Sequence, residues 1–260
     1  ESLFFDLGDA ARLSPRIAHQ IKAVFLSHAH LDHVAGFIWF LRSRIGLFGP
    51  CSIYGPQDTI FRIESFLNAI TWDRIEDNGP IFKVHEILGD RLRSACLQPG
   101  CPRRDLPDRS MENGSIFSAA DYRVSAVICD HKIPSVAYAL HFDKEISVRK
   151  ERLAAHGWSP GPWLGRLKVS IAAEAIDEMI DLPDGSRKPA GELAPLLTLV
   201  RPGKTFVYAA DMADTHANRR KLIDVAHGAH TLFCETAFVS ADADRAAATQ
   251  HLTTQAAVDI

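Results

Sequence analysis

The sequence predicts a sheet-rich α+β or layered α/β chain, and two observations support this fold class. Apolar stretches of four to eight residues, separated by turn residues, dominate the first two-thirds of the 260 residues. Units of one short strand followed by a helical pattern then close the chain. Because this order suits sheets with helices outside them, we expect one layered domain.

The first half of the chain is expected to be mostly strands. They are predicted at residues 4–7, 23–26, 52–54, 81–88, 91–97 and 115–118. Apolar residues at helical spacing predict one helix over residues 31–47 and a second over about 55–70. The proline-rich stretch 103–109, in which arginines and aspartates are interleaved, is interpreted as a solvated loop.

In the second half, apolar residues alternate over 122–128 and 136–142, which indicates two half-buried strands joined by residues 129–135. Two further short strands, at 205–209 and 231–234, each precede a helical pattern. Together with the strands of the first half, they complete the set of elements expected in the core.

The segment 143–204 differs from its surroundings in charge. Residues 144–168 hold six Lys and Arg against two Glu, whereas residues 169–192 hold two against six Asp and Glu. One interpretation is an inserted or arm-like solvated segment with a basic face; the other is a surface for a phosphate backbone. The candidate contacts of such a surface are Arg149, Lys150, Arg166 and Lys168.

Composition excludes several classes of protein. Apolar residues make up 47% of the chain and charged residues 23%, so disorder is not expected. The net charge of −3 means that binding of nucleic acid would need a local patch. No apolar run approaches the ~18 residues of a membrane span. Five cysteines without C-x-x-C spacing indicate neither a disulfide framework nor a zinc ribbon, and favour a reducing cytoplasm.

Both ends of the sequence have an internal character. Residues 1–5 are already strand-like, with no Met and no signal-peptide pattern. Residues 257–260 lie within a helical pattern that has no stop residue. We therefore expect a single domain over residues 1–260 that lacks something at both ends.

The chemistry is expected at a His-x-His-x-Asp-His motif over residues 28–33, directly after a predicted strand. In an extended segment His28 and His30 project to the same side. Once a helix begins, Asp32 and His33 can address a neighbouring point. Neutral imidazole and carboxylate suit Zn²⁺, Mn²⁺ or Fe, so the motif predicts a site for two metals.

A two-metal site needs further ligands, and two downstream residues are candidates. His131 lies between the strands predicted at 122–128 and 136–142. Asp211 follows the strand predicted at 205–209, where a carboxylate could bridge two cations. Taken alone, either residue could instead belong to a turn or cap a helix. Two roles are possible for Glu235: it could hold a neighbouring loop or histidine, or it could cap a helix.

The motif resembles the signature of the metallo-β-lactamase fold hydrolases, and further segments resemble one branch, the ribonuclease Z family of tRNA 3′-processing endonucleases. The segments are Phe4-Phe5-Asp6-Leu7-Gly8, His131-Lys132-Ile133-Pro134 with Tyr138, Gly161 to Lys168, Asp184-Gly185, Arg201-Pro202-Gly203, Glu235-Thr236-Ala237-Phe238 and His251-Leu252-Thr253-Thr254. The resemblance covers nearly the whole chain and implies a four-layer αββα sandwich.

The resemblance also implies roles for particular residues. It implies ligands for two zinc ions: His28, His30 and His131 on one, Asp32 and His33 on the other, and Asp211 on both. It implies that His251 donates a proton to the leaving group, beside Asp32 in the catalytic set. It further implies that the last ligand, a histidine, lies beyond Ile260.

The activity implied is endonucleolytic removal of the 3′ trailer of a tRNA precursor by a hydroxide bound to two metals. The basic residues of 144–168 would hold the RNA, and the family forms homodimers. Ala210, Ser27 and residues 9–11 depart from the family pattern. The alternative is a hydrolase of the same fold for a small ester, lactone, thioester or cyclic nucleotide. A non-catalytic relative is disfavoured because every ligand position within the chain is filled.

Overall fold

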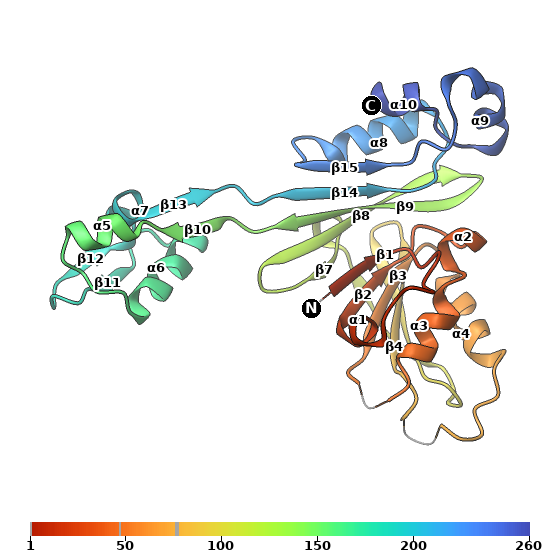
Figure 1. Cartoon of the computed structure of the whole chain (residues 1–260), viewed down its shortest axis with the longest axis horizontal. Coiled ribbons are helices and arrows are strands. Elements are labelled where there is room, and N and C mark those ends of the chain that lie inside the picture. The colour runs from red at the N-terminus through yellow and green to blue at the C-terminus, as the bar shows by residue number, and fades with distance from the viewer. Residues whose placement is uncertain (1, 47, 76–77) are drawn as a thin grey trace. The chain divides into compact units, whose positions relative to one another are not determined.

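The computed structural model describes residues 2–46, 48–75 and 78–260, and the chain forms two compact units. One unit comprises Glu1–Leu140 and Thr205–Ile260, and the other comprises His141–Lys204. Both contain strands and helices (Figure 1). Leu47, the last residue of the helix predicted over 31–47, lies outside the described residues.

The first sheet of the larger unit follows the order of the chain. Strands β1 to β4 lie side by side and parallel, and β5 and β6 extend the sheet antiparallel to their neighbours. These strands are β1 (Ser2–Phe5), β2 (Ile21–Phe25), β3 (Cys51–Gly55), β4 (Phe82–Leu88), β5 (Arg91–Leu97) and β6 (Arg104–Ser110).

The second sheet has the order β15-β14-β9-β8-β7. Strands β14 and β15 run parallel, whereas β7 and β8 run antiparallel. The bounds are β7 (Ser115–Ser118), β8 (Tyr122–His131), β9 (Ile133–Phe142), β14 (Thr205–Ala209) and β15 (Thr231–Cys234). The strand positions predicted for this half of the chain are therefore confirmed within a few residues.

Alternation of side chains along the strands produces the layers of the core. Val24 packs among side chains of helices α1 (Pro15–Gln20), α3 (Phe37–Ser43) and α4 (Thr59–Asn68), whereas its neighbour Phe25 packs with Tyr138 of the second sheet. Ala139, next to Tyr138, packs instead with Leu222 of α8 (His216–Ala226). Helices thus lie outside two facing sheets, and the predicted four-layer αββα arrangement is confirmed.

The helices of the larger unit lie between the strands and after them, and α1 was not predicted from the sequence. They are α1 (Pro15–Gln20), α2 (Leu31–Val34), α3 (Phe37–Ser43), α4 (Thr59–Asn68), α8 (His216–Ala226), α9 (Ala243–Thr249) and α10 (Thr254–Val258). Short 3₁₀ turns occupy Glu112–Gly114 and Ser240–Asp242. In the part of the chain that is described, no helix has the length and apolar character needed to cross a bilayer.

The prediction of one continuous helix over residues 31–47 is wrong, because the chain forms two helices there, α2 and α3, on either side of Gly36. The amide of Gly36 donates a hydrogen bond to the carbonyl oxygen of Leu7 at 2.7 Å. A Cβ at Gly36 would lie 2.7 Å from the Cβ of Ala10 and 2.8 Å from the Leu7 oxygen. The close approach of this glycine to the segment after β1 therefore divides the apolar pattern.

Two other predictions of connecting segments were also wrong. Residues 103–109 are not a solvated loop, because β6 pairs with β5 at the edge of the first sheet. An edge strand tolerates Pro107 and exposed charges, so its sequence lacks the usual apolar alternation.

The link predicted over 129–135 is shorter than expected, since β8 reaches His131 and β9 starts at Ile133. Lys132, with a φ of 59°, makes the turn between them.

The smaller unit has its own apolar core, built around Leu167, Ile180, Leu193 and Leu197. Strand β10 pairs with β13, and β11 pairs with β12. Its elements are β10 (Glu145–Val148), α5 (Lys150–Ala155), α6 (Pro162–Ala172), β11 (Met179–Asp181), β12 (Arg187–Pro189), α7 (Ala190–Leu197) and β13 (Thr198–Arg201). This unit covers nearly the same residues as the segment with the unusual charge pattern.

Candidate metal centre

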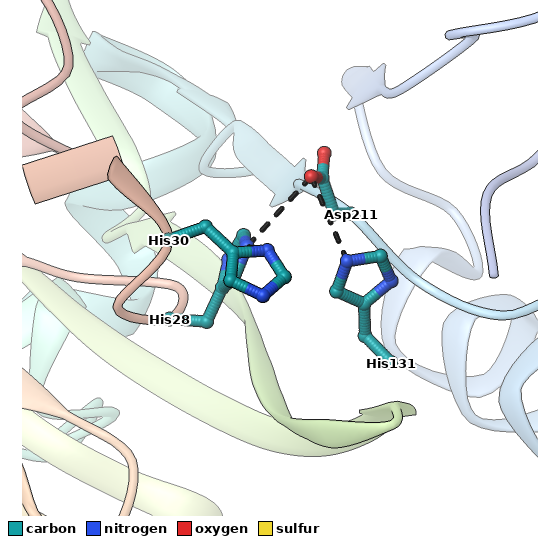
Figure 2. A group of neighbouring side chains, drawn as sticks. All are labelled: His28, His30, His131 and Asp211. Atoms are coloured by element: carbon teal, nitrogen blue, oxygen red, sulfur yellow. Dashed lines mark hydrogen bonds and ion pairs between the residues drawn. The ribbon is translucent and has the colours of Figure 1, made fainter. Parts of the chain in front are cut away.

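The ends of three strands position the candidate ligands in the larger unit. Residues 28–33 follow β2 and enter α2, His131 is the last residue of β8, and Asp211 follows β14 by two residues. Figure 2 shows His28 and His30 on one side, with His131 facing them and Asp211 reaching in from a third segment. Residues far apart in sequence therefore meet at one point.

The first group of candidate ligands consists of His28, His30, His131 and Asp211, whose ligand atoms all lie within 4.8 Å of one another. His28 Nε2 and His30 Nδ1 are 2.9 Å apart. Asp211 Oδ2 lies 3.7 Å from His28 Nε2 and 3.8 Å from His131 Nε2 (Figure 2). Two nitrogen ligands of one tetrahedral zinc ion are about 3.3 Å apart, so these spacings suit a single ion.

The second group consists of Asp32, His33 and Asp211. His33 Nε2 lies 3.4 Å from Asp211 Oδ2 and 3.5 Å from Asp32 Oδ2. The side chain of Asp32 is 77% exposed, whereas those of His33 and Asp211 are mostly buried. Asp211 is common to both groups, which is the position that a bridging carboxylate requires.

Hydrogen bonds outside the cluster fix the orientation of two of these rings. His28 Nδ1 lies 2.9 Å from Ser27 Oγ, and His131 Nδ1 donates to the carbonyl oxygen of Gln250 at 2.7 Å. With the proton held at Nδ1, the lone pair of each Nε2 faces Asp211. Contacts of this kind to the second nitrogen are the usual support of histidines that bind a metal.

Asp6, the residue after β1, supports the site and was not assigned a role from the sequence. It accepts hydrogen bonds from the amide and hydroxyl of Ser27, both at 2.7 Å, and from Tyr208 Oη at 2.8 Å. His33 Nδ1 donates to Asp6 Oδ2 at 2.7 Å. The signal available in the sequence was the resemblance of Phe4-Phe5-Asp6-Leu7-Gly8 to the family, which assigned no role to Asp6. In the structure Asp6 lies beside β2, because β1 pairs with that strand. That neighbourhood is a tertiary fact, so the role could not be derived locally.

Burial and neighbouring charges shift the pKa values of His28 and His33 in opposite directions. Burial, together with the charge of His33, lowers the pKa of His28 to about 4, so its ring is neutral and free to act as a ligand. Burial opposes a charge on His33, but hydrogen bonds to Asp211 and Asp6 raise its pKa to about 10. Burial also opposes a charge on Asp211, yet His33 holds the pKa of that carboxyl below its usual value.

The donor set therefore fits a divalent metal ion. Neutral imidazole nitrogens converge on an ionised carboxylate, and each ring with an outer hydrogen bond turns its free nitrogen inward. In the ion-free arrangement, a proton on His33 balances the charge of Asp211. A cation would take over that balance, because metal binding displaces protons from its ligands.

A third group, Asp211, Glu235 and His251, borders the first two. His251 Nδ1 donates to Glu235 Oε2 at 3.1 Å and lies 3.9 Å from Asp211 Oδ2. Glu235 Oε1 accepts hydrogen bonds from the amides of Met212 at 2.8 Å and Leu252 at 3.3 Å. Of the two interpretations of Glu235, the one in which it holds neighbouring loops and a histidine is correct. It does not cap a helix, because the next helical element, the 3₁₀ turn Ser240–Asp242, begins five residues later.

The predicted substrate contacts lie in the other unit, within His141–Lys204. Lys150 and Lys168 are exposed, Arg149 is partly buried before α5, and Arg166 is paired with Asp181 at 3.0 Å. The pairing leaves Arg166 with less free charge than the sequence suggested. Its role in binding substrate, like that of the other three residues, stays a prediction.

Known proteins that are similar to this chain in sequence include ribonucleases Z. No family model matches the chain. The chain is 26% identical to ribonuclease Z of Deinococcus radiodurans over 243 residues, covering 91% of the chain and 71% of that protein. It is 29% identical to ribonuclease Z of Synechococcus sp. strain CC9605, covering 97% of the chain and 70% of that protein.

Among solved structures, the short form of human tRNase Z superposes with a TM-score of 0.50 at 16% identity. The superposition covers 98% of this chain and 75% of that one, which shows a shared fold. The resemblance to ribonuclease Z that the motifs indicated is thereby confirmed over nearly the whole chain.

Proposed function

We propose that this protein is a metal-dependent phosphodiesterase similar to ribonuclease Z, which cleaves RNA endonucleolytically at the 3′ trailer of a tRNA precursor. The observation that carries the proposal is the convergence of two His/Asp groups on one shared carboxylate, Asp211. The resemblance to ribonucleases Z supports the choice of an RNA substrate.

Two ions are proposed, with zinc as the first choice and manganese or iron as metals that accept the same ligands. His28, His30 and His131 would hold one ion, Asp32 and His33 would hold the other, and Asp211 would contact both. Ions at these positions would make a water acidic enough to supply hydroxide near neutral pH and would offset charge on the phosphoryl oxygens. The side chain of Asp32 is 77% exposed, so a substrate could reach the ion that Asp32 would hold.

His251 is the proposed proton donor to the leaving ribose oxygen. Glu235 holds its Nδ1, so the other ring nitrogen, Nε2, is left to carry the transferable proton. Glu235 is itself tied to the amides of Met212 and Leu252, which fixes the ring between the β14 loop and the segment after α9. The chain's own contribution to leaving-group departure is thus a proton held at a defined atom.

The segment His141–Lys204 is proposed to hold the RNA through Arg149, Lys150, Arg166 and Lys168. The support for this role is the excess of Lys and Arg over residues 144–168. A homodimer and a cytoplasmic location remain predictions from the resemblance and the composition.

One assay separates the proposed activity from the alternative. The zinc-loaded protein is given a tRNA precursor, a bis-aryl phosphodiester and a lactone side by side, and initial rates are compared. We expect cleavage of the precursor at its 3′ trailer and turnover of the phosphodiester. Rapid lactone turnover without phosphodiester turnover would replace the proposed function with that of a small-ester hydrolase.

A further inference from the structure

An apolar cavity of about 320 Å³ borders the metal centre on the side of α4. One wall is formed by the segment after β2 and by α2, through His28, Ala29 and Val34. The opposite wall is α4, through Arg62 and Phe66 among others. The proposed function gives this cavity no role.

His28 belongs both to the lining of the cavity and to the candidate ligands of the metal centre. The side chain of His28 is fully buried and its Nε2 lies 3.7 Å from Asp211 Oδ2, so the residue separates the cavity from the candidate ligands. A group that fills the cavity therefore lies within one side-chain thickness of the candidate ligands. Its occupant is most simply the part of the substrate next to the reacting bond.

Aromatic side chains give the cavity flat walls. The ring of Phe66 packs against Phe37 of α3, with centroids 5.3 Å apart, so its position is fixed from behind. Phe61, earlier on the same helix, also lines the cavity and is 65% exposed. Flat apolar surfaces of this kind accept a planar ring by stacking, and a nucleobase presents such a ring whatever its sequence.

Arg62 adds a positive charge to the lining. Within the described residues, its guanidinium has no hydrogen-bond or ion-pair partner. The nearby acid of the same helix, Glu64, lies instead 3.9 Å from Arg103. An arginine without an acidic partner beside an apolar cavity is complementary to a ligand with an apolar ring and a negative group.

We propose that this cavity is a subsite for one nucleotide of the substrate. The base of the nucleotide flanking the scissile phosphate enters the cavity, and Arg62 binds the next phosphate along the strand. An acyl chain would fill the apolar part but leave Arg62 unused, so the charge favours the nucleotide. The inference rests on the proposed function, since a nucleotide occupant presumes a nucleic-acid substrate.

The first test measures binding without catalysis. Metal-free protein is titrated with AMP, adenosine and inorganic phosphate, followed by NMR. We expect AMP to bind more tightly than either fragment, and Arg62→Gln to weaken AMP binding about tenfold, as loss of one charged hydrogen-bonded contact does. Arg42→Gln, which removes an exposed arginine of α3 outside the cavity, serves as the matched control.

Two results would overturn the subsite. One is an AMP affinity that is the same in wild type, Arg62→Gln and Arg42→Gln. The other is binding of a hexanoyl lactone in the cavity where AMP does not bind, which would identify an acyl occupant.

The second test uses RNA substrates that differ in one phosphate. Two short oligonucleotides, with and without the phosphate beyond the flanking base, are cleaved by zinc-loaded protein. Wild type is expected to prefer the longer one by about tenfold in kcat/KM, and Arg62→Gln to lose that preference while Arg42→Gln keeps it. If neither oligonucleotide is cleaved by wild type, the proposed function fails, and the AMP titration still decides the subsite. If both are cleaved and the preference is unchanged in Arg62→Gln, the subsite alone fails.

Discussion

The two units use charged side chains in opposite ways. In the larger unit, polar groups are buried and join residues far apart in sequence, as in the hydrogen bonds of Asp6 with Tyr208 and of His131 with Gln250. In the smaller unit, ion pairs such as Arg166 with Asp181 are exposed and join residues close in sequence. Buried, mutually satisfied groups hold a defined geometry, whereas exposed pairs contribute little to stability. The difference predicts where substitutions matter.

The largest effect is expected at Asp211. Asp211→Asn removes the negative charge shared by both ligand groups, so we expect metal affinity and phosphodiesterase activity to fall by more than about 100-fold. Metal content after dialysis and initial rates measure the two quantities. Asp181→Asn in the smaller unit is the control and should leave bound metal unchanged; an Asp211→Asn protein that keeps its metal and its rate would contradict the shared-ligand geometry.

Asp6 ranks second, because it holds the candidate ligand His33 by a hydrogen bond but is not itself a candidate ligand. Asp6→Asn keeps the size of the side chain but weakens its hold on His33, so metal affinity should fall about 10- to 100-fold. Competition with a chelator gives the affinity. Tyr208→Phe, which removes one hydrogen bond to Asp6, should cost about 1 kcal/mol in stability and change metal affinity less. Equal affinities of Asp6→Asn and wild type would show that His33 is oriented without Asp6.

His85, a largely buried histidine of the larger unit, is expected to make the stability of the fold depend on pH. Burial, with smaller contributions from Arg109 and Lys83, lowers its pKa to about 4, while the unfolded chain keeps the ordinary value of 6.5. The unfolded state therefore binds more protons between these values, so stability falls as pH drops from about 6.5 toward 4, by roughly 2–3 kcal/mol in total.

Urea unfolding at pH 7 and pH 5 measures this effect. His85→Gln should lose less stability between the two values than wild type, because it has no proton to gain. The matched control is His227→Gln, at an exposed position after α8, which should follow wild type. The prediction fails if the pH dependence of His85→Gln equals that of wild type.

The smallest effect is expected at Arg166 and Asp181. Both side chains are more than half exposed, so the double-mutant cycle through Arg166→Ala and Asp181→Ala should give a coupling below about 1 kcal/mol that vanishes in high salt. Thermal unfolding of the four proteins provides the values. A coupling of several kcal/mol would remove the contrast between the two units.

The sequence predicted the parts of the site that are encoded by neighbours in the chain. Residues 28–33 follow one strand directly, so period-two alternation and the start of a helix were enough to place four candidate ligands. His131 and Asp211 needed the prediction that each lies at a strand end. Asp6 could not be placed, because its partners His33 and Tyr208 become neighbours only when β1 lies beside β2 and near β14.

The prediction of the fold was wrong at two places where contacts with another element override the local sequence pattern. The apolar periodicity over residues 31–47 gave no sign of a break, yet Gly36 must approach Leu7 and Ala10. Strand β6 was missed because an edge position relieves it of the need for apolar alternation. In both cases the contact that determines the local structure is made with another element of the chain. A short window of sequence around the residue therefore cannot predict it.

The distance along the chain between the parts of the metal centre has a thermodynamic consequence. The ligand groups combine residues 28–33 with His131 and Asp211 from distant strands, and their supporting contacts span 202 residues from Asp6 to Tyr208. The complete set of candidate ligands therefore exists only in the folded chain. An ion that binds this set and not the unfolded chain stabilises the fold in proportion to the logarithm of its concentration. At a thousand times Kd the gain is about 4 kcal/mol. The supply of metal in the surroundings would then set the melting temperature of this protein as well as its activity.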